Sequence, residues 1–439
     1  MLKAGLCAVD ITPPAGVRQS GYAGRTLPSL AVHDPLWARA LVLDDGSIRV
    51  GLVGLDLAGV PATLLEPVRE EAASRDGIAP EGLLLGATHT HSGPQLWSDE
   101  PTEVEREYAN SLPARVGDAV SGAAANLTEA TVSVASGWTA VGTNRRELLP
   151  GGRVELGRNH FGPFDPELGV LRVGDANGET IGVVMNYTAH ALCLAEDNYL
   201  LTADYPGHAC HYVEDRLEKG VSIFFNGAAG DVNPREGPMY HGVLNGGSFL
   251  AAQHAGDAIA TETIGVLSKA RKIESEKLAC ASRKIELPTN PQRALKAAEE
   301  CLRAAEANAP AQDYHFDRYL VWDQRAEGAD AARRRLERVK ARGDKPVEME
   351  IQVIVIGDLA LLGWAGEVFC ELGMMAKAGS PYARTYVLGY ANGSVGYIPT
   401  PDAFPLGGYE AESAFHLADN AGLVLVEESL ALLREMKAR

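Results

Sequence analysis

The sequence of 439 residues predicts an α/β fold, with a layered mixed β-sheet core flanked by helices. Two observations carry this prediction. Short β-branched and apolar runs alternate with helical stretches in the first half of the chain, which is typical of sheets covered by helices. Residues 290–343 are instead rich in Ala, Glu and Arg, which predicts two amphipathic helices around an aromatic turn at 313–322. We therefore expect residues 1–439 to form a single domain that carries 290–343 as a helical hairpin insert.

The first half supplies most of the expected strands, at 48–56, 83–88, 130–135, 167–173 and 181–187. Helices are expected at 62–74 and 104–126. Pro67 has no backbone N–H, so it is compatible with the first helix only if it lies in the first turn. Further along, residues 348–364 predict a β-hairpin that turns at Gly357-Asp358, and a final helix is expected at 413–437.

The charge balance restricts the classes of partner. The chain has 58 acidic and 40 basic residues, for a formal net charge of −18. Such a surface repels phosphate backbones and anionic lipid head groups, which argues against nucleic-acid binding and stable membrane association. A small-molecule substrate is expected instead, either neutral or cationic, or with a charge that meets a local basic pocket.

The start of the chain has neither the basic segment nor the apolar run of a secretion signal. Its six cysteines are scattered and form no CxxC pair, so they are expected to be reduced thiols. These features predict a cytoplasmic protein. The sequence leaves open whether the chain forms a homo-oligomer.

Three polar segments after apolar runs are candidates for chemistry. They carry His89 and His91 in ATHTHSG, His190 in NYTAH, and Glu367 in GEVF. Two imidazoles and a carboxylate beyond strand ends match the ligand set of catalytic zinc sites, which leave a position open for water. We therefore predict one Zn²⁺ per chain held by His89, His190 and Glu367, with His91 free for acid–base work. The alternative for each histidine taken alone is a hydrogen-bonded structural role.

Residues 225–235, FNGAAGDVNPR, combine small residues with polar ones. The small residues permit close backbone approach and an anion-binding nest of N–H groups. Asp231 and Asn233 are candidates to orient a substrate or a metal-bound histidine. The alternative is a tight turn with no functional role. A later loop, at 390–400, holds several tyrosines, and packing is the default interpretation for them.

Taken in order, these segments resemble the catalytic domain of the neutral/alkaline ceramidase family. The matching segments are VDITPP at 9–14 with Gly21-Tyr22-Ala23, ATHTHSGP at 87–94, NYTAH at 186–190, AGDVNP at 229–234, GEVF at 366–369, GYIPT at 396–400 and YEAE at 409–412. The resemblance implies a zinc enzyme that hydrolyses an N-acyl bond. It also implies that Tyr397 is a fourth or near ligand of the metal, and that Arg145 and Tyr409 contact the substrate or stabilise the oxyanion.

The chain departs from the family pattern where Asn233 replaces a serine assigned to catalysis. Asparagine cannot act as that nucleophile, but it can donate a hydrogen bond to an oxyanion. Secreted members also carry a β-sandwich domain and a secretion signal, and we expect this chain to lack both. These departures favour a small soluble substrate over ceramide, cleaved by metal-activated water.

Other functions stay open. The same chemistry serves a zinc-dependent esterase or lactonase. A metal that polarises a carbonyl also suits a lyase or isomerase. A non-catalytic binding relative of the fold is a further alternative.

Overall fold

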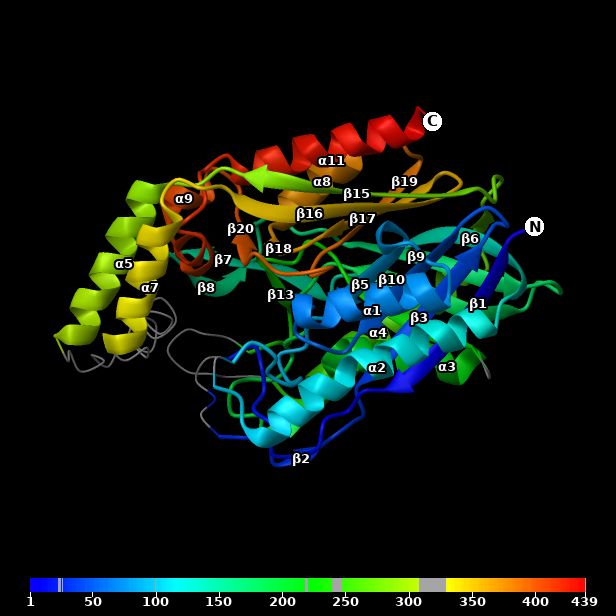
Figure 1. Ribbon diagram of the computed structural model, residues 1–439, viewed down its shortest axis with the longest axis horizontal. Helices are drawn as coiled ribbons and strands as arrows, with labels where there is room; N and C mark the ends of the chain where they lie inside the picture. The colour runs from blue at the N-terminus through cyan, green and yellow to red at the C-terminus, as the bar shows by residue number, and fades with distance from the viewer. Residues whose placement is uncertain are drawn as a thin grey trace.

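The computed structural model describes residues 1–22, 25, 27–98, 100–217, 220–238, 247–307 and 329–438. It confirms the layered α/β fold with a mixed sheet core (Figure 1). The aromatic turn predicted at 313–322 lies outside the described residues. Among the residues described, no helix combines the length and apolarity needed to cross a membrane.

The larger sheet has nine strands, which run in the order β12-β10-β9-β6-β1-β3-β4-β5, with β14 paired to β6. Their bounds are β1 (Lys3–Asp10), β3 (Trp37–Asp44), β4 (Arg49–Leu55), β5 (Leu83–Ala87), β6 (Thr128–Trp138), β9 (Glu167–Asp175), β10 (Thr180–Tyr187), β12 (Val221–Asn226) and β14 (Arg271–Lys272). Most neighbours are antiparallel, but β4 with β5 and β10 with β12 are parallel. The edge strand β12 also contacts β3, β4 and β5, so the sheet curls back on itself.

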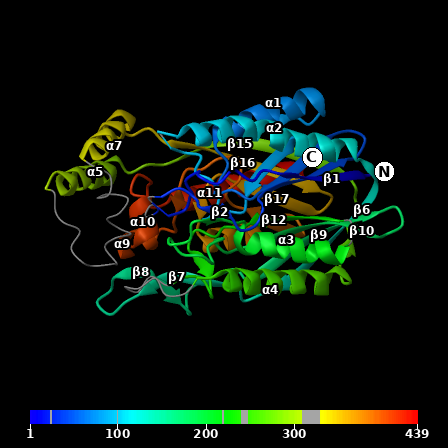
Figure 2. The same ribbon diagram turned by 90° about the horizontal axis from the view of Figure 1, so that it is seen from below.

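Two helix pairs cover this sheet on opposite sides (Figure 2). One pair is α1 (Ala62–Arg75) and α2 (Glu103–Ala125), which bury apolar side chains against β3, β4 and β5. The other pair is α3 (Asp204–Leu217) and α4 (Phe249–Leu267), which pack on the β9, β10 and β12 part of the sheet.

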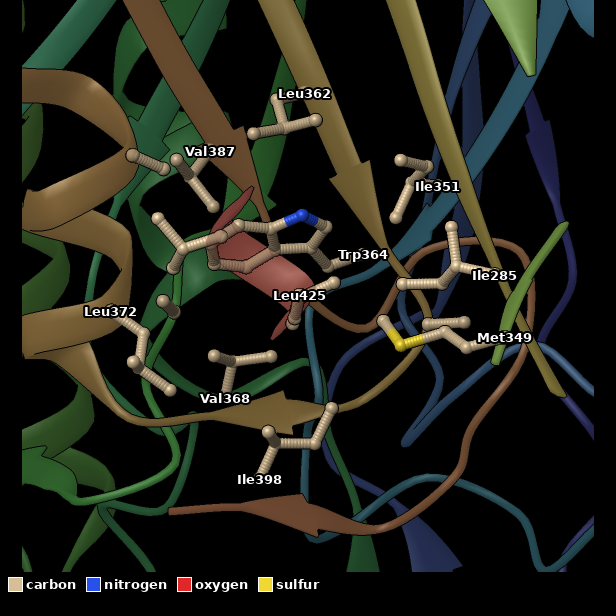
Figure 3. Close-up of a cluster of buried hydrophobic side chains, with 14 of the residues drawn as sticks. Ile285, Met349, Ile351, Leu362, Trp364, Val368, Leu372, Val387, Ile398 and Leu425 are labelled. Atoms are coloured by element: carbon tan, nitrogen blue, oxygen red, sulfur yellow. The ribbon is translucent and has the colours of Figure 1, made fainter. Parts of the chain in front are cut away.

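A second sheet has the order β15-β16-β17-β19 and lies under α8 (Cys370–Gly379) and α11 (Ala421–Lys437). Its strands are β15 (Leu278–Leu287), β16 (Val347–Ile356), β17 (Leu359–Trp364) and β19 (Arg384–Leu388). Trp364 lies at the centre of the core between the sheet and these helices (Figure 3), and its indole N–H donates to Ser429 Oγ at 2.9 Å. The predicted hairpin turn is confirmed, since Gly357 adopts a φ of 57° between β16 and β17.

Short elements complete the fold. They are β2 (Ala31–Val32), η1 (Pro80–Gly82), β7 (Gly142–Leu148), β8 (Val154–Asn159), β11 (Leu200–Leu201), β13 (Val232–Pro234), β18 (Glu367–Val368), β20 (Tyr397–Ile398), α9 (Ala403–Leu406) and α10 (Tyr409–Ser413). Within the predicted insert, α5 (Pro291–Glu306) and α7 (Ala329–Arg342) contact each other and project from the sheets (Figure 1).

Two local predictions were wrong. Pro67 lies beyond the first turn of α1, so the carbonyl one turn earlier receives no N–H from Pro67. The helix nevertheless continues, because Leu64, Leu65 and Val68 are buried in the core. The final helix begins at Ala421, well after 413. The segment before it forms turns instead, and backbone bonds hold it, from Asn290 N to His416 O and from Ala418 N to Pro288 O.

The fold brings several strand ends to one place. The pairs β4/β5, β10/β12 and β17/β19 are parallel, so within each pair both strands end at the same edge. A bridge between Gly86 in β5 and Ala391 just after β19 joins the two sheets at this edge. The chain therefore collects at this edge the polar segments that follow β5, β10, β12, β17 and β19.

Candidate active site

Three side chains predicted as metal ligands converge at this edge. His89 follows β5, His190 follows β10, and Glu367 begins β18 just after β17. Glu367 Oε2 lies 3.2 Å from His190 Nε2 and 3.4 Å from His89 Nε2. The sequence separations are large, but the three donor atoms are within reach of one cation.

Backbone carbonyls fix the orientation of both imidazoles. His89 Nδ1 lies 2.5 Å from Ala58 O, and His190 Nδ1 lies 2.6 Å from Ala229 O. A carbonyl only accepts, so each Nδ1 carries the proton and each Nε2 presents its lone pair toward Glu367. Metal-binding histidines are commonly held in this way.

Burial and charge favour a neutral imidazole beside an ionised carboxylate. Burial, with the nearby Arg145 guanidinium, lowers the pKa of His190 to about 4. Burial also acts to raise the pKa of Glu367, but a positive charge beside it, on His89 or His190 when protonated, outweighs burial and holds that pKa well below its usual range. Neutral imidazole and carboxylate are the protonation states that bind a cation.

His91 lies on the same side of the site. Its Nε2 is 3.2 Å from His89 Nε2, and its buried Nδ1 has no hydrogen-bond partner among the described residues. Burial and then the neighbouring His89 and His190 lower the pKa of His91 well below 6.5. Ring nitrogens of His89, His91 and His190 all lie within 4.8 Å of one another, so these three buried histidines could hold a metal ion. The geometry thus also offers His91 as a ligand, beside its predicted acid–base role.

Arg145 lies behind the histidines and connects four groups. Its Nη1 donates to Asn233 Oδ1 at 3.1 Å and lies 3.2 Å from His190 Nε2, while its Nη2 donates to Tyr397 Oη at 2.9 Å. Its Nε pairs with Glu410 Oε1 at 2.6 Å. Arg145, Asn233 and Tyr397 therefore belong to one hydrogen-bonded cluster, and their predicted roles toward metal and substrate stay predictions.

A cavity of about 370 Å³ is lined by Tyr397 of this cluster and by His89, His91 and Glu367. His89 stacks on Tyr390 inside it, with ring centroids 4.0 Å apart, and Tyr397 meets Tyr409 edge to face at 5.5 Å. Trp97 lines its outer part and is 44% exposed. The cavity therefore presents two histidines, a carboxylate and three tyrosines to a ligand.

Asp231 lies apart from that cavity. Its carboxylate accepts from Cys370 N at 2.8 Å and from Asn144 Nδ2 at 2.9 Å, and it lines a separate cavity of about 210 Å³. Its backbone carbonyl accepts from Arg145 N. Asp231 is thus placed to hold the segments of the site together, and a direct catalytic role for it stays a prediction.

Sequence reasoning missed two residues of the site. Tyr390 is buried against His89, and its hydroxyl has no partner among the described residues. Glu410 is 1% exposed and pairs with both Arg145 and Arg146. The adjacent Arg145 and Arg146 were a signal, because two buried guanidinium groups need a carboxylate partner. Nothing in the local sequence indicates which carboxylate of the chain that partner is.

Comparison with known proteins identifies the family of the chain. Residues 2–251 match the model of the neutral/alkaline non-lysosomal ceramidase N-terminal family, which is more than half of the chain. The chain belongs to this ceramidase family. It is 26% identical over 244 residues to a neutral ceramidase of Pseudomonas aeruginosa and 24% identical over 268 residues to one of Mycobacterium tuberculosis. These matches cover 52% and 54% of the chain, but only 36% and 41% of the two relatives.

The structural likeness extends further than the sequence match. The crystal structure of the Pseudomonas aeruginosa neutral ceramidase aligns with 99% of this chain and 75% of its own, with a TM-score of 0.74 at 22% identity. The ceramidase fold thus extends through both sheets, beyond the part matched by the family model.

Proposed function

We propose that this chain is a zinc-dependent hydrolase that cleaves an N-acyl amide bond of a small soluble substrate. The observation that carries the proposal is the convergence of His89 Nε2, His190 Nε2 and Glu367 Oε2 beside a third buried imidazole. His89 and Glu367 also line a cavity, from which a ligand can reach them. Family membership supports the amide bond, since the relatives are neutral ceramidases.

The residues present fit a zinc ion. Two nitrogens and a carboxylate oxygen form a ligand set typical of catalytic zinc. His89 Nε2 and His91 Nε2 lie 3.2 Å apart, and His89 carries its proton on Nδ1. A cation bound at His89 Nε2 would therefore also satisfy the lone pair of that nitrogen, which faces His91. His89, His190 and Glu367 would hold the metal, with Tyr397 near it. When bound, zinc polarises a carbonyl oxygen and lowers the pKa of water to about 7.

The chain's own side chains supply the remaining chemistry. His91 is kept neutral by burial, so it can accept a proton from the attacking water and return it to the leaving amine. Tyr397 accepts a hydrogen bond from Arg145, which leaves its own O–H free to donate to a developing oxyanion. Tyr409 stands beside Tyr397 at the cavity wall. Asn233, bonded to Arg145, replaces the serine of the family and supplies no nucleophile.

The cavity supports a small substrate. Ligand pockets for drug-sized molecules span about 300–1,000 Å³, and this one, at about 370 Å³, is near the lower end. An ester or lactone of similar size would also fit the cavity, so assays on matched amide, ester and lactone compounds should show which bond is cleaved fastest. Cytoplasmic localisation and the oligomeric state stay predictions.

The test combines metal content with rate. Purified wild-type protein should contain one zinc per chain, His190→Ala should lose it, and His91→Ala should keep it while kcat falls by roughly 10²–10⁴-fold. The exposed His160 supplies a matched control, since His160→Ala should change neither quantity. Loss of zinc in His91→Ala would show that His91 is a ligand. Wild-type protein without any transition metal would favour a non-catalytic binding protein.

A further inference from the structure

A cleft of about 880 Å³ lies at the base of the helical hairpin. Four basic side chains line it, three from the last turns of α7 and one just beyond: Arg335, Arg338, Arg342 and Lys345. Glu348 is the one carboxylate among its lining residues. In a chain of net charge −18, this concentration of positive charge is a local exception.

The helix turns these charges toward the cleft. Positions 335, 338 and 342 are three and four residues apart, so they lie on one helical face. The described part of the chain contains no ion pair for the side chains of Arg338, Arg342 or Lys345. By contrast Arg333, on another face of α7, pairs with Glu306 and Asp330. The positive charges of Arg338, Arg342 and Lys345 therefore raise the local potential and attract an anion.

Two further features of the cleft also indicate a positive electrostatic potential. Burial, together with Arg342 and Arg293, lowers the pKa of His416 in the cleft wall to about 4, as expected in cationic surroundings. The helix α5 also begins at the cleft with Pro291, and the N-terminus of a helix carries a partial positive charge.

The cleft adjoins the candidate active site. Ser394 lines both the cleft and the cavity that holds His89 and Glu367. The neighbouring Val395 faces the cleft, while Gly393 faces the cavity. A ligand whose scissile bond lies at the histidines can therefore extend past Ser394 toward the arginines.

We propose that this cleft binds a carboxylate or phosphate group of the substrate, so that the enzyme selects anionic N-acyl compounds. The inference rests on the proposed hydrolase function and names its substrate class. Arg338 and Arg342 would hold the anion, and the charge of the substrate would distinguish it from the neutral amides that fit the cavity alone.

The test compares two compounds in two variants. One compound is an amide whose acyl chain ends in a carboxylate, and the other is the same amide with that carboxylate reduced to an alcohol. Arg338→Glu/Arg342→Glu reverses the charge of the cleft, and Arg334→Glu/Lys340→Glu makes the same change at exposed residues of α7 that do not line it. Affinity is measured by calorimetry, and kcat/KM by amide hydrolysis.

Wild-type protein should bind and cleave the charged compound preferentially by roughly tenfold or more, as charge-assisted hydrogen bonds provide. The cleft variant should lose that preference, and the control variant should keep it. Equal preference in wild type and cleft variant would overturn the proposal.

Inorganic phosphate separates a substrate group from an independent anion. It should compete with the charged compound and not with the neutral one. Phosphate that binds in the cleft without such competition would overturn the assignment to substrate. Because calorimetry needs no turnover, an absence of hydrolysis would refute the hydrolase function, while the affinity ratio would still decide on the cleft.

Discussion

Glu410 is the carboxylate that neutralises two adjacent buried arginines, and its replacement by glutamine tests the architecture of the site. Its Oε1 pairs with Arg145 Nε at 2.6 Å and its Oε2 with Arg146 Nη1 at 2.7 Å. All three side chains are at most 9% exposed. Burial acts to raise the pKa of Glu410, but the two guanidinium groups outweigh it and lower that pKa, so the carboxylate is ionised at neutral pH.

The size of the effect follows from the uncompensated charge. Removing one partner of a buried ion pair costs about 3–5 kcal/mol. Glutamine keeps the shape and one acceptor oxygen, so we expect Glu410→Gln to lower the free energy of unfolding by about 3 kcal/mol. That is a large part of the roughly 5–15 kcal/mol that stabilises a protein domain.

Urea unfolding of Glu410→Gln measures this loss, and Glu427→Gln, at an exposed position of α11, is the matched control. A double-mutant cycle with Arg146→Gln tests the cause, because removing one of the two stranded charges should recover about 1 kcal/mol or more. A loss in Glu410→Gln within about 1 kcal/mol of the control, or purely additive losses in the cycle, would refute the reasoning.

Two further predictions concern buried groups outside the site. Burial raises the pKa of Asp204 from 3.8 to about 6, so the folded state holds a proton that the unfolded state releases between these values. The stability that this group contributes is therefore present below pH 4 and is lost as pH rises to 6, by about 3 kcal/mol in all. Urea unfolding measured across this range should show the free energy of unfolding fall with pH, and Asp204→Asn should remove this fall. Ser429→Ala leaves the indole N–H of Trp364 without its acceptor and should cost about 1–3 kcal/mol, seen as a lower thermal midpoint, whereas Ser74→Ala on the exposed face of α1 should have little effect.

Local pattern was sufficient for most elements of the fold. The strands β4, β5, β9 and β10 lie within two residues of their predicted bounds because each is a short apolar run that ends at polar residues. The start of the last helix was not predictable, since residues 416–418 are held by backbone pairing to residues 288–290, just after β15. The local sequence carries no trace of that pairing.

The same distinction applies to the site. His89, His190 and Glu367 were predictable because each follows a strand, and parallel strands end together. Glu410 was not, since its partners Arg145 and Arg146 lie on β7, more than 260 residues away. Tertiary packing alone creates that pairing. Without Glu410, Arg145 could not be buried as a cation beside His190.

The backbone shows how strongly chemistry selects residues at this edge. In the described chain, four residues other than glycine have positive φ, namely His89 at 64°, Asp204 at 56°, Tyr390 at 55° and Asn392 at 57°. Such a conformation costs about 1–3 kcal/mol for a bulky residue and suits glycine far better. Yet His89 and Tyr390 adopt it side by side, with their rings stacked at 4.0 Å in the cavity. Glycine would relieve the backbone at either position but would remove the imidazole or the ring that supports it, so the side chain outweighs local preference where the ligands converge.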